Sequence, residues 1–380
     1  PRPILNVPSF LMKSAVQASF FTRLLHRQHH EGVVSRFHFM EEEFVEGNFL
    51  GLPQREGDVD VAIVPLAYEL TTSYGTGTAQ GPSACIDASA QVELYDSVLG
   101  QDLPAGLVIA TVPEWEGTRP TLLGQLDELA DHASAWYNGA CFPLFLGGEH
   151  GILPPVIRSS ISHPLVDGNL DRLTVVQIDA HADLRASLDG EPFSHACAAA
   201  RTLDTGIGKL LQVGIRAYSR EEAALISSDT RITTYFAKDT QHPHSGTKHW
   251  DAWLNTLRSL KGPVHLTLDL DGLDGALVPA TGTPVPGGLS FWQVIETIET
   301  LFQVPEVSVI GADVNEIGCQ EDTPLTQFTA AQLATKIVAC HALARKEQRW
   351  TPTPHSSSHD ESSTYFRAMK EPQHSVGDHA

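Results

Sequence analysis

The sequence predicts a three-layer α/β/α fold, in which a mostly parallel sheet lies between two layers of helices. Short apolar runs rich in β-branched residues recur along the chain, and this is the pattern of strands buried on both faces. Stretches with apolar residues at helical spacing lie between these runs. An alternation of strands and helices is typical of a parallel sheet that helices cover on both faces.

The predicted elements follow one another along most of the chain. We expect strands at residues 60–66, 107–112, 142–146, 173–178, 210–215, 264–270 and 307–310. We expect helices within residues 121–137, 250–260, 290–302 and 330–344. Another helix is expected after Ser219, where Ser-Arg-Glu-Glu resembles a capping box. Residues 71–82 are rich in glycine, threonine and serine and are predicted to form a loop.

Changes in composition predict the domain organisation. Residues 1–50 form a predicted N-terminal extension, residues 51–345 the main domain, and residues 346–380 a polar tail that we expect to be disordered. The first 30 residues contain no acid but four lysine or arginine residues, a composition that resembles a transit peptide. A mitochondrial location is therefore an open alternative, although we favour an extension that packs on the core or on a neighbouring subunit.

The chain is strongly acidic, with 46 aspartate and glutamate residues, 25 lysine and arginine residues and a formal net charge of −21. Such a surface repels nucleic acid and anionic lipid and favours cationic ligands. The five cysteines are scattered without a C-x-x-C pair, which argues against a disulfide framework and indicates the reducing cytoplasm. No apolar run approaches the roughly 18 residues that cross a bilayer. We therefore expect no nucleic-acid partner and no membrane partner.

Three polar segments follow predicted strands. In open α/β sheets, the carboxyl ends of the strands are where ligands bind. The first segment, residues 145–150, reads Phe-Leu-Gly-Gly-Glu-His, and its two glycines permit a tight turn that would place His150 above the sheet. Taken alone, a histidine after two glycines is more often structural than a ligand.

The second segment, residues 177–183, contains Asp179, His181 and Asp183 at a spacing of two. In an extended chain, side chains two apart point to the same side, so we expect two carboxylates and one imidazole on one face. A solvated strand end is the simpler interpretation, but the preceding run at 173–178 is apolar and predicted to be buried. Burying two unpaired carboxylates is costly without a cation.

The third segment, residues 266–271, adds two acids. Asp269 and Asp271 are expected on one face of the strand, with Leu268 and Leu270 on the other. His265 has the same parity as the two acids but lies deeper in the strand. We interpret it as a core histidine whose hydrogen bonds are satisfied, and not as a ligand.

The charges in these segments predict a pair of metal ions. Two divalent cations would neutralise four carboxylates, and two imidazoles complete a set of six ligands: His150, Asp179, His181, Asp183, Asp269 and Asp271. Carboxylate oxygens with one imidazole per metal suit Mn²⁺, whereas zinc sites use more cysteine or histidine; nickel and iron remain open. Two metals about 3.5–4 Å apart lower the pKa of a shared water toward neutrality, which creates a nucleophile strong enough to attack a guanidinium carbon.

The three segments resemble, in order, the metal-binding signatures of the ureohydrolase (arginase/agmatinase) family. The third continues through residues 277–288, Leu-Val-Pro-Ala-Thr-Gly-Thr-Pro-Val-Pro-Gly-Gly, which is also typical of the family. The resemblance covers about residues 58–345. It implies a single arginase-like domain with a sheet of roughly eight strands, a homo-oligomer (a trimer or a hexamer), and a metal-dependent hydrolase that releases urea from a guanidinium group.

The resemblance also implies a role for each residue. One Mn²⁺ would be held by His150, Asp179, Asp183 and Asp269, and the other by Asp179, His181, Asp269 and Asp271. His195 would pass a proton to the leaving amine, and Glu316 would pair with the guanidinium through two parallel hydrogen bonds. With Asp271, these two form the predicted catalytic set. Without the resemblance, His195 could be a helix N-terminal residue and Glu316 a surface acid.

Finer matches predict the substrate. Residues 74–82, 91–96 and 183–185 resemble agmatinases more than arginases. We therefore expect a small cationic guanidino substrate, agmatine, which would be cleaved to putrescine and urea.

Departures from the family pattern keep other hypotheses open. Gly151, Cys197 and Gly275 stand where other residues are usual, which leaves room for a guanidine or guanidinobutyrate hydrolase that uses Ni²⁺. A hydrolase of another linear C–N bond and a non-catalytic scaffold subunit are the remaining hypotheses. Retention of all six predicted ligands argues against both.

Overall fold

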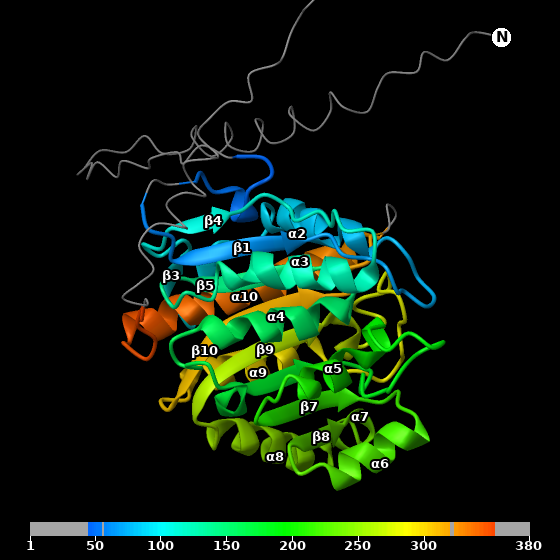
Figure 1. The fold of residues 1–380 in the computed structure, drawn as a ribbon. Coiled ribbons are helices and arrows are strands. Elements are labelled where there is room, and N and C mark those ends of the chain that lie inside the picture. Colours follow the sequence, from blue (N-terminus) through cyan, green and yellow to red (C-terminus); the bar gives the residue numbers. More distant parts are fainter. Residues whose placement is uncertain (1–44, 55–56, 320–322, 354–380) are drawn as a thin grey trace, which may run out of the picture. The chain divides into compact units, whose positions relative to one another are not determined.

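A parallel sheet forms the centre of the fold. The computed structural model describes residues 45–54, 57–319 and 323–353, all of which belong to the unit Glu43–Ala380. Eight strands pair in the order β4-β1-β5-β10-β9-β6-β7-β8, and every neighbouring pair is parallel (Figure 1). The predicted sheet is thus confirmed.

The strands of this sheet are β1 (Val61–Leu66), β4 (Ile109–Thr111), β5 (Phe142–Gly147), β6 (Thr174–Ile178), β7 (Lys209–Ile215), β8 (Ile232–Phe236), β9 (Gly262–Asp269) and β10 (Val307–Asn315). A separate antiparallel pair consists of β2 (Tyr95–Asp96) and β3 (Gln101–Asp102). The strand β8 was not predicted from the sequence. This strand lies at the edge of the sheet and only Ile232 in it is buried, so it lacks the continuous apolar run of the other strands.

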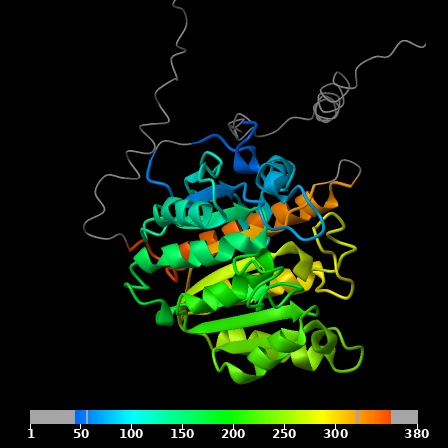
Figure 2. The same cartoon turned by 45° about the vertical axis from the view of Figure 1, so that its right-hand side comes forward.

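Helices cover both faces of the sheet, as predicted (Figures 1 and 2). One hydrophobic core joins the sheet to α2 (Gly81–Ser89), α8 (Gly246–Arg258), α9 (Phe291–Gln303) and α10 (Leu325–Lys346). The other joins it to α3 (Leu122–Ser134), α4 (Leu153–Ser159) and α5 (Ala198–Asp204), with α6 (Arg220–Ser228) packed at its margin. The short α7 (Ala237–Thr240) follows β8. Successive side chains of β1 point to opposite faces of the sheet, so Val61 and Ile63 pack in the first core and Ala62 and Val64 in the second.

Helix boundaries follow local chemistry where a capping residue is present. The predicted capping box is confirmed at α6, where Ser219 and Glu222 satisfy each other's backbone N–H groups, and α9 begins with the same motif. The predicted loop at 71–82 ends before residue 82, because α2 begins at Gly81. Pro82 lies in the first turn of this helix, a position that proline tolerates. The helix predicted up to residue 137 ends at Ser134.

Short 3₁₀ turns complete the described secondary structure. They are η2 (Phe49–Gly51), η3 (Thr78–Gln80), η4 (His150–Ile152), η5 (Ser160–Ser162), η6 (Leu170–Arg172), η7 (His195–Cys197) and η8 (Leu270–Gly272). Two of them, η4 and η8, begin within a few residues of the carboxyl ends of β5 and β9. These turns carry predicted site residues away from the strands and toward one another.

The two ends of the chain lie largely outside the described residues. The predicted extension is described only from residue 45, and the predicted tail only to residue 353. Within that part of the tail, Trp350 is buried and its N–H donates to the carbonyl of Ala344 at the end of α10. No helix in the described ranges is both long enough and apolar enough to cross a membrane.

Candidate metal centre

His150 reaches the centre through the turn after β5. An added Cβ at Gly147 would collide with the Asn315 side chain, and one at Gly148 with the backbone of Tyr68, so the close approach at both positions requires glycine. The imidazole that follows is 1% exposed. Its Nδ1 lies 3.1 Å from an Asp179 carboxylate oxygen and 3.0 Å from an Asp183 oxygen.

The second segment converges by turning and not by continuing the strand. The predicted extended geometry is wrong here, because β6 ends at Ile178 and Asp183 has a φ of 53° in the left-handed region. The Asp179 carboxylate accepts a hydrogen bond from the backbone N–H of His181 at 2.6 Å, which stabilises the turn. Asp179 and Asp183 are buried, whereas the His181 side chain is 30% exposed.

The third segment also leaves its strand at the first acid. Asp269 ends β9 and caps η8 by accepting from the backbone N–H of Asp271, so these two acids do not share a strand face as predicted. One oxygen of Asp271 accepts from the N–H of Ala180 at 3.0 Å, and the other lies 2.9 Å from His181 Nδ1. Neighbouring strands β9 and β6 are thereby joined through their polar ends.

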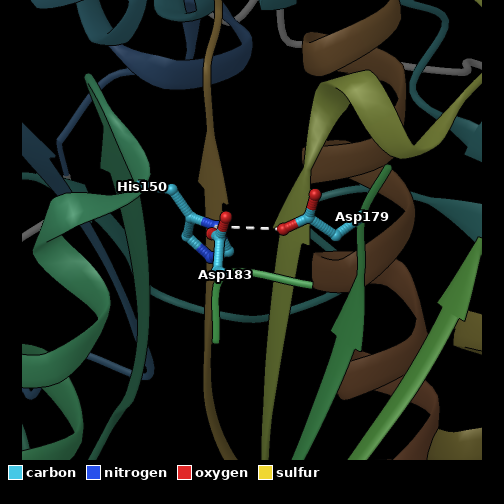
Figure 3. Close-up of side chains that lie close together, drawn as sticks. All are labelled: His150, Asp179 and Asp183. Atoms are coloured by element: carbon cyan, nitrogen blue, oxygen red, sulfur yellow. Dashed lines mark hydrogen bonds and ion pairs between the residues drawn. The ribbon is translucent and has the colours of Figure 1, made fainter. Parts of the chain in front are cut away.

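Five of the six predicted ligands come together in two overlapping groups. One group is His150, Asp179 and Asp183, whose side chains point toward one another (Figure 3), and the other is Asp179, His181 and Asp271; within each, the ligand atoms lie within 4.8 Å of one another. Asp269 joins them, because one of its oxygens lies 3.5 Å from His150 Nδ1. Asp179 is common to both groups.

The electrostatics of this cluster fit a pair of cations. Burial, with the nearby charges of Asp183 and Asp271, raises the pKa of Asp179 to about 7. Burial, with the nearby charges of Asp271 and Asp179, also raises the pKa of Asp269 well above its ordinary value. Carboxylates this close together resist simultaneous ionisation unless a positive charge lies between them. The oxygen-rich donor set, with one imidazole in each group, suits divalent cations.

A cavity of about 340 Å³ opens beside these residues, and His181, Asp183 and His195 line it. His195 begins η7; its backbone N–H donates to the Thr71 hydroxyl at 2.9 Å, and its Nε2 lies 3.4 Å from the Ser73 hydroxyl. A larger cavity of about 460 Å³ lies beside β4 and contains none of the predicted site residues.

Glu316 contacts the backbone of His150, the first predicted ligand. It follows β10 with a φ of 59°, and one of its oxygens accepts from the backbone N–H of His150 at 2.9 Å. The side chain is 7% exposed, and burial raises its pKa to about 8. It is therefore a buried acid, not a surface acid.

Two residues that shape the site were not predicted from the sequence. Glu149 is fully buried and accepts from the N–H and the hydroxyl of Thr71, so it supports the residue that holds His195. Arg216 donates to backbone carbonyls around the turn after β9. An acid beside His150 was visible in the sequence, but its partner, 78 residues away, was not.

The interpretation of His265 is confirmed. The ring is fully buried, one nitrogen lies 2.9 Å from the Tyr137 hydroxyl, and the other is hydrogen-bonded to Asp313. It therefore has partners on both sides and lies below the cluster of ligands in β9.

A parallel sheet with acids and imidazoles clustered at its carboxyl edge is the arrangement of an α/β protein that can bind metal ions there. Residues 59–340 match the arginase family, and the chain belongs to that family. Enzymes of the arginase family are metal-dependent amidinohydrolases with a two-metal centre. The family match and the relatives named as ureohydrolases confirm the predicted class and enzyme type.

Named relatives agree with this assignment. The chain is 34% identical to the N(1)-aminopropylagmatine ureohydrolase of a Synechocystis species, over 74% of this chain and 89% of that one. It is 32% identical to the agmatinase of Pyrococcus horikoshii, over 75% and 93%. A crystal structure of a hypothetical agmatinase from Burkholderia thailandensis aligns with a TM-score of 0.66 and 28% identity, over 79% and 92%.

Proposed function

We propose that this protein hydrolyses agmatine to putrescine and urea. The observation that supports this proposal most is the clustering of six acids and histidines, with Asp179 common to both groups, in a chain whose relatives include an agmatinase. The relative named as an N(1)-aminopropylagmatine ureohydrolase favours a second candidate, the same cleavage on a longer amine. Guanidine and guanidinobutyrate are the remaining candidates.

The ligand set follows the two groups in the structure. We propose that His150, Asp179, Asp183 and Asp269 hold one Mn²⁺, and that Asp179, His181, Asp269 and Asp271 hold the other. When bound, the two ions supply positive charge to polarise the substrate and to lower the pKa of water. Ni²⁺ remains the alternative metal.

Glu316 is proposed to orient the guanidinium. A carboxylate can face a planar guanidinium with two parallel, charge-assisted hydrogen bonds. Because burial raises the pKa of Glu316 to about 8, a cation beside it would favour its ionised form. Its fixed bond to the His150 N–H holds the carboxylate in one place relative to the metal ligands.

His195 is proposed to transfer the proton that the leaving amine requires. It lies on the wall of the cavity with two of the proposed ligands, and the Thr71 hydroxyl fixes its backbone. In this role the imidazole N–H gives its proton to the amine nitrogen as the C–N bond breaks, and solvent restores it.

The acidic net charge supports a cationic substrate, and we further propose a cytoplasmic homo-oligomer, a trimer or a hexamer. Light scattering of the purified protein should give three or six times the mass of one chain, 41.2 kDa. A monomer in solution would contradict this assembly without affecting the chemistry.

Urea release from a substrate panel tests the function. Agmatine, aminopropylagmatine, arginine, guanidinobutyrate and guanidine should each be tested with Mn²⁺ and with Ni²⁺, and we expect the highest kcat/KM for agmatine with Mn²⁺. Metal analysis should find two ions per chain. Activity on arginine alone would contradict the substrate proposal, and a fully active metal-free protein would contradict the metal centre.

A further inference from the structure

A line of polar groups runs through the buried centre of the sheet below the metal centre. Thr267 and His265 belong to β9, and Asp313 belongs to the adjacent β10, where it pairs in register with Thr267. All three side chains are fully buried. An ionisable pair inside a sheet costs stability unless its hydrogen bonds are satisfied.

The line joins five side chains and ends on a proposed ligand. The Tyr137 hydroxyl lies 2.9 Å from His265 Nδ1, and His265 Nε2 is bonded to one oxygen of Asp313. The other Asp313 oxygen accepts from the Thr267 hydroxyl at 2.6 Å. The Thr267 oxygen in turn lies 2.8 Å from His150 Nε2.

Proton counting fixes the direction of the last hydrogen bond. A threonine hydroxyl has a single proton, and Thr267 gives it to Asp313. The Thr267 oxygen can therefore only accept from His150, so Nε2 of that ring must hold the proton. Nδ1 is then left with a free lone pair, and Nδ1 is the atom that faces the Asp179 and Asp183 carboxylates.

We propose that Thr267 and Asp313 are positioning residues, which select the tautomer of His150 and hold its Nδ1 toward the metal centre. Hydrogen bonds from His265 and Asn315 to the Asp313 carboxylate keep that carboxylate an acceptor for the Thr267 proton. Outer partners of this kind orient metal-binding histidines and typically contribute about 10- to 100-fold to metal affinity. The proposal rests on the proposed function, in which His150 is a ligand.

Substitution at Thr267 tests this role. Thr267→Val has nearly the same shape but no hydroxyl, whereas Thr267→Ser keeps the hydroxyl. Mn²⁺ binding to the purified full-length chain should be measured by calorimetric titration. We expect Thr267→Val to bind one of the two ions about 10- to 100-fold more weakly, and Thr267→Ser to restore the affinity of the unchanged protein.

A matched control separates positioning from loss of stability. Thr297 is also fully buried, and its hydroxyl accepts a hydrogen bond from the indole N–H of Trp253, in the core that α8 and α9 share. Thr297→Val should therefore lower thermal stability without changing Mn²⁺ affinity. Equal Mn²⁺ affinity in Thr267→Val and the unchanged protein would overturn the positioning role, as would equally weak binding by Thr267→Val and Thr267→Ser. An unchanged protein that does not bind two ions would overturn the proposed function, and this inference with it.

Discussion

Asp271 shows how a single side chain serves both structure and chemistry. One oxygen accepts a hydrogen bond from the Ala180 N–H, and the other lies 2.9 Å from His181 Nδ1. This carboxylate therefore connects the turn after β9 to the turn after β6. Its charge is also one of those that the proposed metal ions would balance. Removing the charge while keeping the shape tests the second role.

The variant Asp271→Asn should bind fewer than two Mn²⁺ per chain. We expect the loss in affinity to exceed the roughly 10- to 100-fold that the loss of an outer partner costs, because a proposed direct ligand is replaced. Metal analysis and urea release measure the change. Asp127→Asn is the control, since Asp127 is exposed and pairs with the exposed Arg158. Two tightly bound ions in Asp271→Asn would contradict the ligand set.

The donors were predictable because acids and histidines that follow apolar runs are conspicuous in a sequence. Their supports were not, because Thr267, Glu149 and Arg216 are ordinary residue types whose roles depend on distant partners. Thr267 and His150 are 117 positions apart, and Glu149 and Thr71 are 78 apart. Nothing local in the chain indicates that such residues meet.

At the scale of elements, the turn after β9 is held by the side chain of Arg216, the residue that follows β7. Arg216 follows β7 and donates to the carbonyls of Asp271, Gly272 and Leu273 within the turn, and to that of Val285 further along. A guanidinium can serve several carbonyls at once because its N–H groups are fixed in a plane. The ammonium of a lysine cannot reproduce this arrangement.

Arg216→Lys should therefore lower the free energy of unfolding by about 2–4 kcal/mol, because several charge-assisted hydrogen bonds are lost while the charge remains. Urea denaturation measures the effect. Arg158→Lys, at an exposed ion pair, should change the free energy by no more than about 0.5 kcal/mol. Equal stability of the two variants would show that the turn does not depend on Arg216.

The helix α10 contains a histidine that should make stability depend on pH. His341 is fully buried between Phe142 and Trp350, and neither ring nitrogen has a hydrogen-bond partner among the described residues. Burial, together with the nearby Arg345, lowers its pKa to about 3 from 6.5. In the unfolded chain the ring takes up a proton near the ordinary value, and in the folded protein it does not.

Between pH 6.5 and 3, only the unfolded state binds this proton, so stability falls as the pH is lowered. The slope is about 1.4 kcal/mol per pH unit, and the contribution is constant above that range. His341→Leu should remove this slope, which urea denaturation at a series of pH values can measure. His244→Leu, at an exposed position, should retain it. The same slope in both variants would contradict the lowered pKa.

Strands with a mostly apolar run and helices with a clear helical period were predictable, and elements with neither signal were not. The strands β5, β6 and β7 lie within a residue of their predicted bounds, because burial on both faces favours a mostly apolar sequence. The helix α4 was missed because its sequence, Leu-Pro-Pro-Val-Ile-Arg-Ser, is short and buried on almost every side, which hides the helical period.

In the whole molecule, the candidate metal centre lies at the carboxyl ends of four neighbouring strands. The strands β5, β10, β9 and β6 lie side by side and provide, at their carboxyl ends, His150, Glu316, Asp269 and Asp179 in that order. The metal centre therefore joins segments from both halves of the chain. Metal binding should stabilise the entire domain, because the buried acids repel one another without it.

Chelation should lower the melting temperature of the protein, and added Mn²⁺ should restore it. A ligand at 100 times its Kd stabilises the folded state by about 2.7 kcal/mol per site. Differential scanning calorimetry with EDTA and then with excess Mn²⁺ measures the shift. Asp271→Asn should show a smaller recovery, and a recovery of equal size in that variant would contradict coupling through this centre.

The amino-acid sequence was sufficient for the parallel α/β class, most of the strands, the six donors and the family, because these depend on residue type, local period and short motifs. The tertiary structure decided which strands are neighbours, and it placed the last acidic segment, on β9, between β6 and β10. It also bent the polar segments into turns and supplied the supports from Thr267, Asp313, Glu149 and Arg216. The physical reason is that strands pair through backbone hydrogen bonds, which carry little information about side chains, so packing and chain crossovers, and not local sequence, select the partners.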